Sequence, residues 1–215
     1  MNQKEILLKT RQHVQKQLKN EASGHDWWHI QRVYHNAELI LEKESCDHFL
    51  VKMAVLLHDI GDYKLHNGID KTHELVYPFL KSLNLQELLI KKILFIIKQI
   101  SFSENKASKP SSIEAMIAQD ADRLDAIGAI GIARAFQYGG YKRHILYDPE
   151  ITPILSNDIN AYKKSTAPIL NHFYEKLLLI KNLMNTKTGK NIANQRHEFM
   201  KIFLAQFYDE WQGKK

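Results

Sequence analysis

Hydrophobic residues recur along this chain at helical spacing, and no segment shows the strict alternation of a half-buried strand. The segment 88–100 is the most apolar, although Lys91, Lys92 and Lys98 interrupt it. The pattern predicts an all-α fold with about eight to ten helices packed around one core. The expected helices cover residues 3–20, 27–43, 45 or 47 to 58, 72–83, 86–100, 113–125, 127–140, 158–184 and 188–211.

Short polar residues stand where several of these helices are expected to begin. Asp26 precedes the second helix, and Ser45 or Asp47 precedes the third. Asn84 precedes the helix over 86–100 in the same way. Such side chains accept hydrogen bonds from the unpaired N–H groups of a first helical turn. We therefore expect each of these positions to cap its helix, and Ser111 or Ser112 to cap the helix over 113–125.

Glycine and proline predict where helices stop. Gly139-Gly140 is expected to end the helix that begins near residue 127, because glycine is common just beyond helix ends. Residues 141–157 contain Pro149 and Pro153 and are predicted to be irregular. The length of this stretch suggests a flap over a functional site.

The composition indicates an ordinary globular chain that can bury its own core. It has 215 residues, of which 44% are hydrophobic and 25% charged. The single cysteine, Cys46, cannot form an internal disulfide, which fits a reducing cytoplasm. The charged amphipathic N-terminus does not resemble a signal peptide, and no apolar run is long enough to span a membrane. We expect one cytoplasmic domain over residues 1–215, with its site within about 20–155 and packing helices over 156–215.

The formal net charge of +6 suits anionic partners such as phosphate compounds or nucleic acid. The positive residues are scattered along the chain, and no helix-turn-helix cue or concentrated basic stripe stands out. A small anionic substrate is therefore the better expectation, and nucleic acid is an unlikely partner.

The first polar insertion into an apolar helix is the adjacent pair His58-Asp59. An imidazole nitrogen and a carboxylate oxygen side by side can bind the same metal ion. Asp62 lies four residues after His58, close enough to take part in chemistry without being a ligand. The alternative is structural: a histidine favoured by the dipole at a helix C-terminus and an aspartate that caps a turn.

A second insertion opens the helix over 27–43. His29 shares a face with apolar residues, so it is predicted to point inward. His25, Asp26, His29 and Arg32 follow at spacings of three and four and line one strip. Buried polar groups are costly unless something pairs with them, and a metal and a phosphate would do so. The alternative for His29 is a core histidine whose hydrogen bonds are satisfied.

The third insertion places Asp120, Asp122 and Asp125 inside an otherwise apolar helix. Small residues surround Asp122 and Asp125 on their face, so another helix can come close to these carboxylates. Asp120 falls among large apolar residues as a buried supporting acid or a cap. The alternative is an acidic patch paired with Arg123 and Arg134. Whether Asp120 or Asp125 assists Asp122 stays open.

The order His29, His58-Asp59, Asp122 resembles the H…HD…D signature of the HD-domain metal-dependent phosphohydrolase superfamily. The segment 121–124 is similar to the final aspartate motif of that family, which favours Asp122 over Asp120. The likeness covers roughly residues 20–155 and points to a small bacterial branch of the superfamily. The ordered triple motif is specific, whereas a bare His-Asp pair is not.

The resemblance implies a site built around one divalent cation, Mn²⁺, Co²⁺, Ni²⁺, Fe²⁺ or Mg²⁺. It implies Asp62 as the group that orients or deprotonates the attacking water. Positive and polar side chains would contact the substrate. The implied metal ligands are His29, His58, Asp59 and Asp122, and the candidate substrate-binding residues are His25, Arg32, Lys64, Arg123, Tyr138 and Lys142.

The implied activity is hydrolysis of nucleotides, with nucleoside triphosphates cleaved to a monophosphate and pyrophosphate. A 5′-nucleotidase, a cyclic-nucleotide phosphodiesterase or an alarmone hydrolase would use the same ligands, so these alternatives stay open. Some HD-type proteins are di-iron oxygenases, and a non-enzymatic nucleotide-binding protein is a third class. The sequence leaves the oligomeric state open, a homodimer being one alternative.

Overall fold

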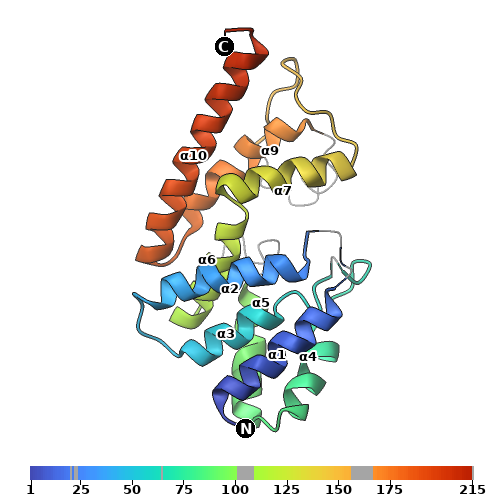
Figure 1. Cartoon of the computed structure of the whole chain (residues 1–215), viewed down its shortest axis with the longest axis vertical. Helices are drawn as coiled ribbons and strands as arrows, with labels where there is room; N and C mark the ends of the chain where they lie inside the picture. Colours follow the sequence, from blue (N-terminus) through green and yellow to red (C-terminus); the bar gives the residue numbers. More distant parts are fainter. Residues whose placement is uncertain (20, 22–23, 64, 101–108, 156–166, 215) are drawn as a thin grey trace. The chain divides into compact units, whose positions relative to one another are not determined.

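A computed structural model describes the chain except for residues 20, 22–23, 64, 101–108, 156–166 and 215. The described part contains helices and no strand, which confirms the all-α fold class. Figure 1 shows the elements α1 (Gln3–Gln17), α2 (Trp27–Leu41), α3 (His48–Leu57), α4 (Thr72–Ser82), α5 (Glu87–Ile100), α6 (Ile113–Asp125), α7 (Gly128–Tyr141), α9 (Ile169–Glu175), the 3₁₀ helix η1 (Leu177–Leu183) and α10 (Lys187–Trp211).

The chain divides into two compact units, Met1–Asp122 and Arg123–Lys215, and each is described by itself. The expectation that residues 1–215 form a single domain stays a prediction. In the described part of the chain, no helix is both long and apolar enough to cross a bilayer.

Helix α3 is the centre of the first unit and packs against α1, α2 and α5. Its residues from Met53 to Leu57 are completely buried. A helix that is apolar on all sides must be surrounded by other helices. The polar pair that follows it, His58-Asp59, therefore lies directly at the end of a core helix.

Side-chain caps fix the starts of the helices that carry the polar insertions. The Oδ1 atom of Asp26 accepts a hydrogen bond from the His29 N–H at 2.8 Å, as predicted for α2. Asp47 caps α3, which decides against Ser45. Ser112 accepts from the Ala115 N–H at 3.2 Å in the first turn of α6, as expected.

The predicted cap at Asn84 is wrong. Asn84 has a φ of 56°, in the left-handed region, and it follows the last turn of α4. Asparagine tolerates this conformation, which commonly terminates a helix. The next helix, α5, begins only at Glu87.

The predicted stop at Gly139-Gly140 falls within one residue of the observed end, because α7 runs to Tyr141. A Cβ atom added at Gly139 would lie 2.4 Å from Cγ1 of Ile169. This glycine therefore permits close packing against α9 within the second unit and does not end the helix. Gly140 has open space where its Cβ would be.

The predicted long helix over 158–184 is another error. Its described part consists of the short α9 and the 3₁₀ helix η1, which a break at Lys176 separates. Residues 158–166 of that prediction lie outside the described part. The final helix, α10, matches its predicted range closely and packs against α7 and η1.

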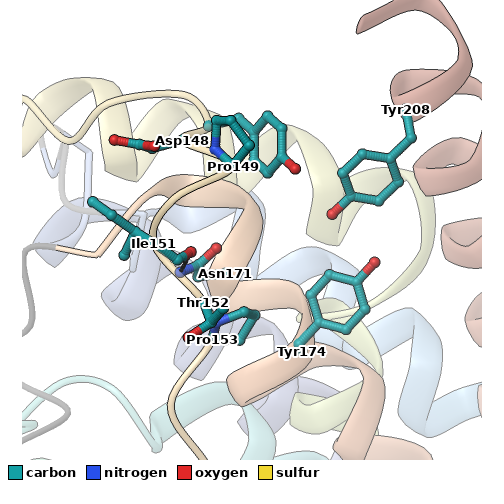
Figure 2. A pocket seen from close by; sticks show the side chains of 9 residues that line it. Asp148, Pro149, Ile151, Thr152, Pro153, Asn171, Tyr174 and Tyr208 are labelled. Carbon is teal, nitrogen blue, oxygen red and sulfur yellow. Dashed lines mark hydrogen bonds between the residues drawn. The ribbon is translucent and has the colours of Figure 1, made fainter. Parts of the chain in front are cut away.

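The irregular stretch after α7 is confirmed for residues 142–155. It is tied to α9 by a hydrogen bond from Asn171 Nδ2 to the Ile151 carbonyl at 3.0 Å. With α9 and α10 it encloses a hollow of about 350 Å³, in which the hydroxyl groups of Tyr174 and Tyr208 turn toward each other (Figure 2). This hollow belongs to the second unit, and a role of the stretch as a flap stays a prediction.

Candidate metal centre

Three helices of the first unit bring the predicted ligands together. His29 lies on the buried face of α2 with 1% of its side chain exposed. His58 and Asp59 follow the last turn of α3 and are buried. Asp122, near the end of α6, keeps 23% of its side chain exposed. The centre is thus closed by the core on one side and partly open at Asp122.

The donor atoms of these four side chains lie close to one another. His29 Nε2 is 3.3 Å from Asp59 Oδ2 and 3.5 Å from Asp122 Oδ1. His58 Nε2 is 3.4 Å from Asp59 Oδ1 and 3.8 Å from Asp122 Oδ1. Donors bound to one ion at about 2.0–2.2 Å are separated by about 3.0–3.5 Å. The spacing therefore fits four ligands around one cation.

The hydrogen bond of His58 fixes which of its nitrogens can bind a metal. Its Nδ1 lies 2.8 Å from the carbonyl oxygen of Val55. A carbonyl can only accept, so Nδ1 carries the proton and Nε2 keeps a lone pair. That Nε2 is buried and makes no hydrogen bond to the described residues. A neutral imidazole held in this way is the form that binds a divalent metal.

The carboxyl group of Asp59 is held in its charged form. Burial would raise its pKa, but the neighbouring His58 and His25 imidazoles outweigh burial and keep the pKa well below its usual value. An ionised carboxylate among imidazoles supplies the negative charge that a divalent cation needs. The chemistry of this donor set therefore also fits a metal.

Two buried amides hold α6 in place within the first unit. Asn36 Nδ2 on α2 donates to the Ala121 carbonyl at 3.0 Å, and Gln119 Nε2 donates to the Gln99 carbonyl at 2.8 Å. Sequence analysis missed both residues. Asn36 follows His29 by seven positions, two helical turns, so a polar residue on that buried face was the available signal.

Gly61 shapes the turn that follows the His-Asp pair. A Cβ atom here would lie 2.2 Å from the backbone Cα of Thr72, so only glycine lets the start of α4 approach. The next residue, Asp62, is half-buried, and its N–H donates to the Asp59 carbonyl at 3.1 Å. The predicted catalytic residue Asp62 therefore lies in the same tight turn as two predicted ligands, His58 and Asp59.

The predicted substrate-binding residues fall into different parts of the structure. His25 lies at the centre, with Nδ1 2.9 Å from Asp59 Oδ2. Arg32 is half-buried on α2, about one turn after His29. Lys64 lies outside the described residues. The first unit thus places His25 among the predicted ligands.

The other three candidates belong to the second unit. Arg123 is only 5% exposed, and its guanidinium donates to the carbonyl of Leu183. Lys142 Nζ lies 5.7 Å from the ring centre of Tyr138, which is more than half exposed. The buried hydrogen bond indicates a structural role for Arg123, whereas Tyr138 and Lys142 are accessible side chains.

The acids of α6 have separate environments. Asp125 forms an ion pair with Arg134 at 2.5 Å. The alternative of an acidic patch paired with arginine therefore holds for Asp125. Asp120 is fully buried, as expected for a supporting acid, and Asp122 faces the imidazoles of His29 and His58. The three carboxylates therefore have different surroundings.

Comparison with known proteins decides the family. The HD-domain profile matches residues 27–127. YpgQ of Bacillus subtilis, an uncharacterized protein, is 41% identical over 202 residues, which are 93% of this chain and 91% of that protein. The chain belongs to the HD superfamily of hydrolases. This confirms the family, and with it a metal-dependent hydrolase, as the order of the polar insertions indicated.

Solved structures agree with this membership. An HD-superfamily hydrolase from Bacillus thuringiensis superimposes with a TM-score of 0.79 at 42% identity, covering 98% of this chain and 99% of that one. YpgQ of B. subtilis, crystallised in complex with ADP, gives 0.78 at 37% identity, covering 98% and 97%. The structural similarity therefore extends over nearly the entire chain and is not limited to the HD domain.

Proposed function

We propose that this HD hydrolase cleaves nucleoside triphosphates to a nucleoside monophosphate and pyrophosphate. One observation carries the proposal: the imidazole nitrogens of His29 and His58 lie 3.3–3.8 Å from carboxylate oxygens of Asp59 and Asp122. The ADP complex of the B. subtilis relative supports a nucleotide as the ligand. The net charge of +6 also favours an anionic substrate.

These four side chains would hold one divalent cation, with Mn²⁺, Co²⁺, Ni²⁺, Fe²⁺ and Mg²⁺ as candidates. Mixed imidazole and carboxylate ligands suit such ions better than a closed thiolate site would. When bound, the cation would lower the pKa of a water molecule and neutralise phosphate charge. Asp122 keeps 23% of its side chain exposed, so this ligand lies where a substrate phosphate has access.

Asp62 accepts the proton of the attacking water in the proposed reaction. Water oxygen forms a bond to the α-phosphorus, the bond from that phosphorus to the bridging oxygen breaks, and pyrophosphate leaves. The reaction also requires positive charge beside the phosphoryl group that is transferred. Arg32, half-buried on α2 beyond His29, is the described side chain of the first unit that we assign to it.

The remaining candidates stay predictions of substrate contact. Tyr138 offers an accessible ring for a base, and Lys142 an ammonium group beside it. Arg123 is buried and donates to a backbone carbonyl, so we rank it last among the candidates for substrate contact. We keep a cytoplasmic location and a small-molecule partner as part of the proposal.

A nucleotide panel with Mn²⁺ tests the function, with orthophosphate and pyrophosphate measured separately. We expect pyrophosphate from nucleoside triphosphates, and we expect Asp59→Ala to abolish it while helical content by circular dichroism stays nearly unchanged. The matched control is Asp70→Ala, an exposed residue that bonds the Thr72 N–H at the start of α4. Orthophosphate as the product would contradict the proposed bond, and full turnover in Asp59→Ala would contradict the metal centre.

A further inference from the structure

His25 lies at the metal centre although the H…HD…D signature gives it no place there. Its Nδ1 is 2.9 Å from Asp59 Oδ2, the shortest of the His–Asp contacts described at the centre. Its side chain is 18% exposed, against 3% for Asp59. The His25 ring meets the His29 ring edge-on, with the centroids 5.5 Å apart. His25 therefore covers the Asp59 side of the centre.

Two overlapping sets of ligand-type residues occur here, His25–His29–Asp59 and His29–His58–Asp122. Both use His29, and its contacts to Asp59 and Asp122 are made by the same Nε2 atom. An imidazole nitrogen has one lone pair, so Nε2 can bind one ion only. The two sets are therefore parts of one centre and not two metal sites.

The direction of the His25 hydrogen bond follows from its partner. An ionised carboxylate has no proton to donate, so Nδ1 of His25 donates and Asp59 Oδ2 accepts. A protonated Nδ1 has no lone pair for a metal. The other carboxylate oxygen, Oδ1, is the atom that faces His58 Nε2 at 3.4 Å.

We propose that His25 is a positioning residue that fixes the rotation of the Asp59 carboxylate by donating from Nδ1 to Oδ2. This inference rests on the metal centre of the proposed function. It gives His25 the role of orienting a metal ligand, in place of contacting the substrate. Hydrogen bonds to metal-binding carboxylates orient them, and their loss typically weakens metal affinity about 10–100-fold.

The test is titration of the full-length, metal-stripped protein with Mn²⁺ by calorimetry. We expect His25→Ala to weaken Mn²⁺ binding roughly 10–100-fold. Asparagine carries an N–H donor on Cγ, where histidine carries Nδ1, so His25→Asn should restore affinity close to that of the unchanged protein. His13→Asn is the matched control, because His13 is a half-buried histidine of the same unit that stacks on Phe79.

Two outcomes would overturn the inference, and a third would overturn only the proposed function. Unchanged Mn²⁺ affinity in His25→Ala would return His25 to substrate contact. Equal weakening in His25→Asn and His25→Ala would show that the ion needs the imidazole nitrogen itself, as a ligand. A protein that binds Mn²⁺ with the expected dependence on His25 but releases no pyrophosphate would contradict the proposed function alone, so the two failures are distinguishable.

Discussion

At the scale of single residues, neighbouring groups decide what each polar side chain can do. One backbone carbonyl orients the His58 ring, and His58 and His25 hold the pKa of Asp59 well below its usual value despite the burial of that carboxyl group. Asp125 is neutralised by Arg134. Two aspartates a few positions apart on α6 thus have different partners: Asp122 faces His29 and His58, and Asp125 faces Arg134.

Asp62 gives the sharpest prediction at this scale. Asp62→Asn removes the proton acceptor and keeps the size of the side chain, so we expect turnover to fall roughly 10²–10⁴-fold. Mn²⁺ binding should persist, because Asp62 is not among the proposed ligands. Steady-state kinetics and calorimetry measure the two effects, with Asp70→Asn in the same loop as control. Normal rates in Asp62→Asn would remove it from the mechanism.

At the scale of elements, caps and close contacts set helix boundaries. Asp26 and Asp47 start α2 and α3 through hydrogen bonds to their first turns. The role of Gly139 in α7 was not predicted, because glycine can serve two purposes, ending a helix or allowing a neighbour to approach. Local sequence cannot distinguish them, since the neighbour at Gly139 is Ile169, thirty positions away.

The adjacent glycines of α7 make a matched pair. Gly139→Ala would force its Cβ against Ile169 and should destabilise the protein by about 1–3 kcal/mol. Gly140→Ala meets open space inside a helix and should stabilise it by roughly 0.5–1 kcal/mol. Thermal unfolding of both variants measures the difference. Equal effects would mean that the packing of α7 on α9 does not explain Gly139.

At the scale of the whole molecule, the chain contains more than the segment that carries the motifs. The HD profile ends at residue 127, shortly after the boundary between the two units. The B. thuringiensis structure nevertheless matches 98% of this chain. The second unit is therefore shared with a relative and is not an addition peculiar to this protein.

Acid stability is a property of this whole molecule to which three histidines with lowered pKa values should contribute. Burial, with nearby Lys176 and His144, lowers the pKa of His172 to about 3 from 6.5, and burial also lowers the pKa values of His13 and His197. Between pH 3 and pH 6.5, His172 is protonated in the unfolded chain and neutral in the folded one. The free energy of unfolding should therefore fall as the pH drops from 6.5 toward 3.

A His172→Gln variant tests this contribution, because glutamine does not titrate in that range. We expect its melting temperature to decline less steeply below pH 6.5 than that of the unchanged protein. Melting curves measured across that interval provide the comparison, and the solvent-exposed His48→Gln is the control. Identical pH profiles for the unchanged protein and His172→Gln would contradict the assignment.

The sequence by itself determined the helical class and most helix starts, because side-chain period and caps are local properties. It also offered His29, His58, Asp59 and Asp122 as candidate ligands through the order of a family motif. It could not predict that His25 would donate to Asp59, that Asn36 and Gln119 would hold α6, or that Gly139 would pack against Ile169. Those contacts join residues 20 to 85 positions apart. Only the packing of helices brings such distant groups within hydrogen-bonding range, so the tertiary structure alone decided which polar residues form the centre and which support it.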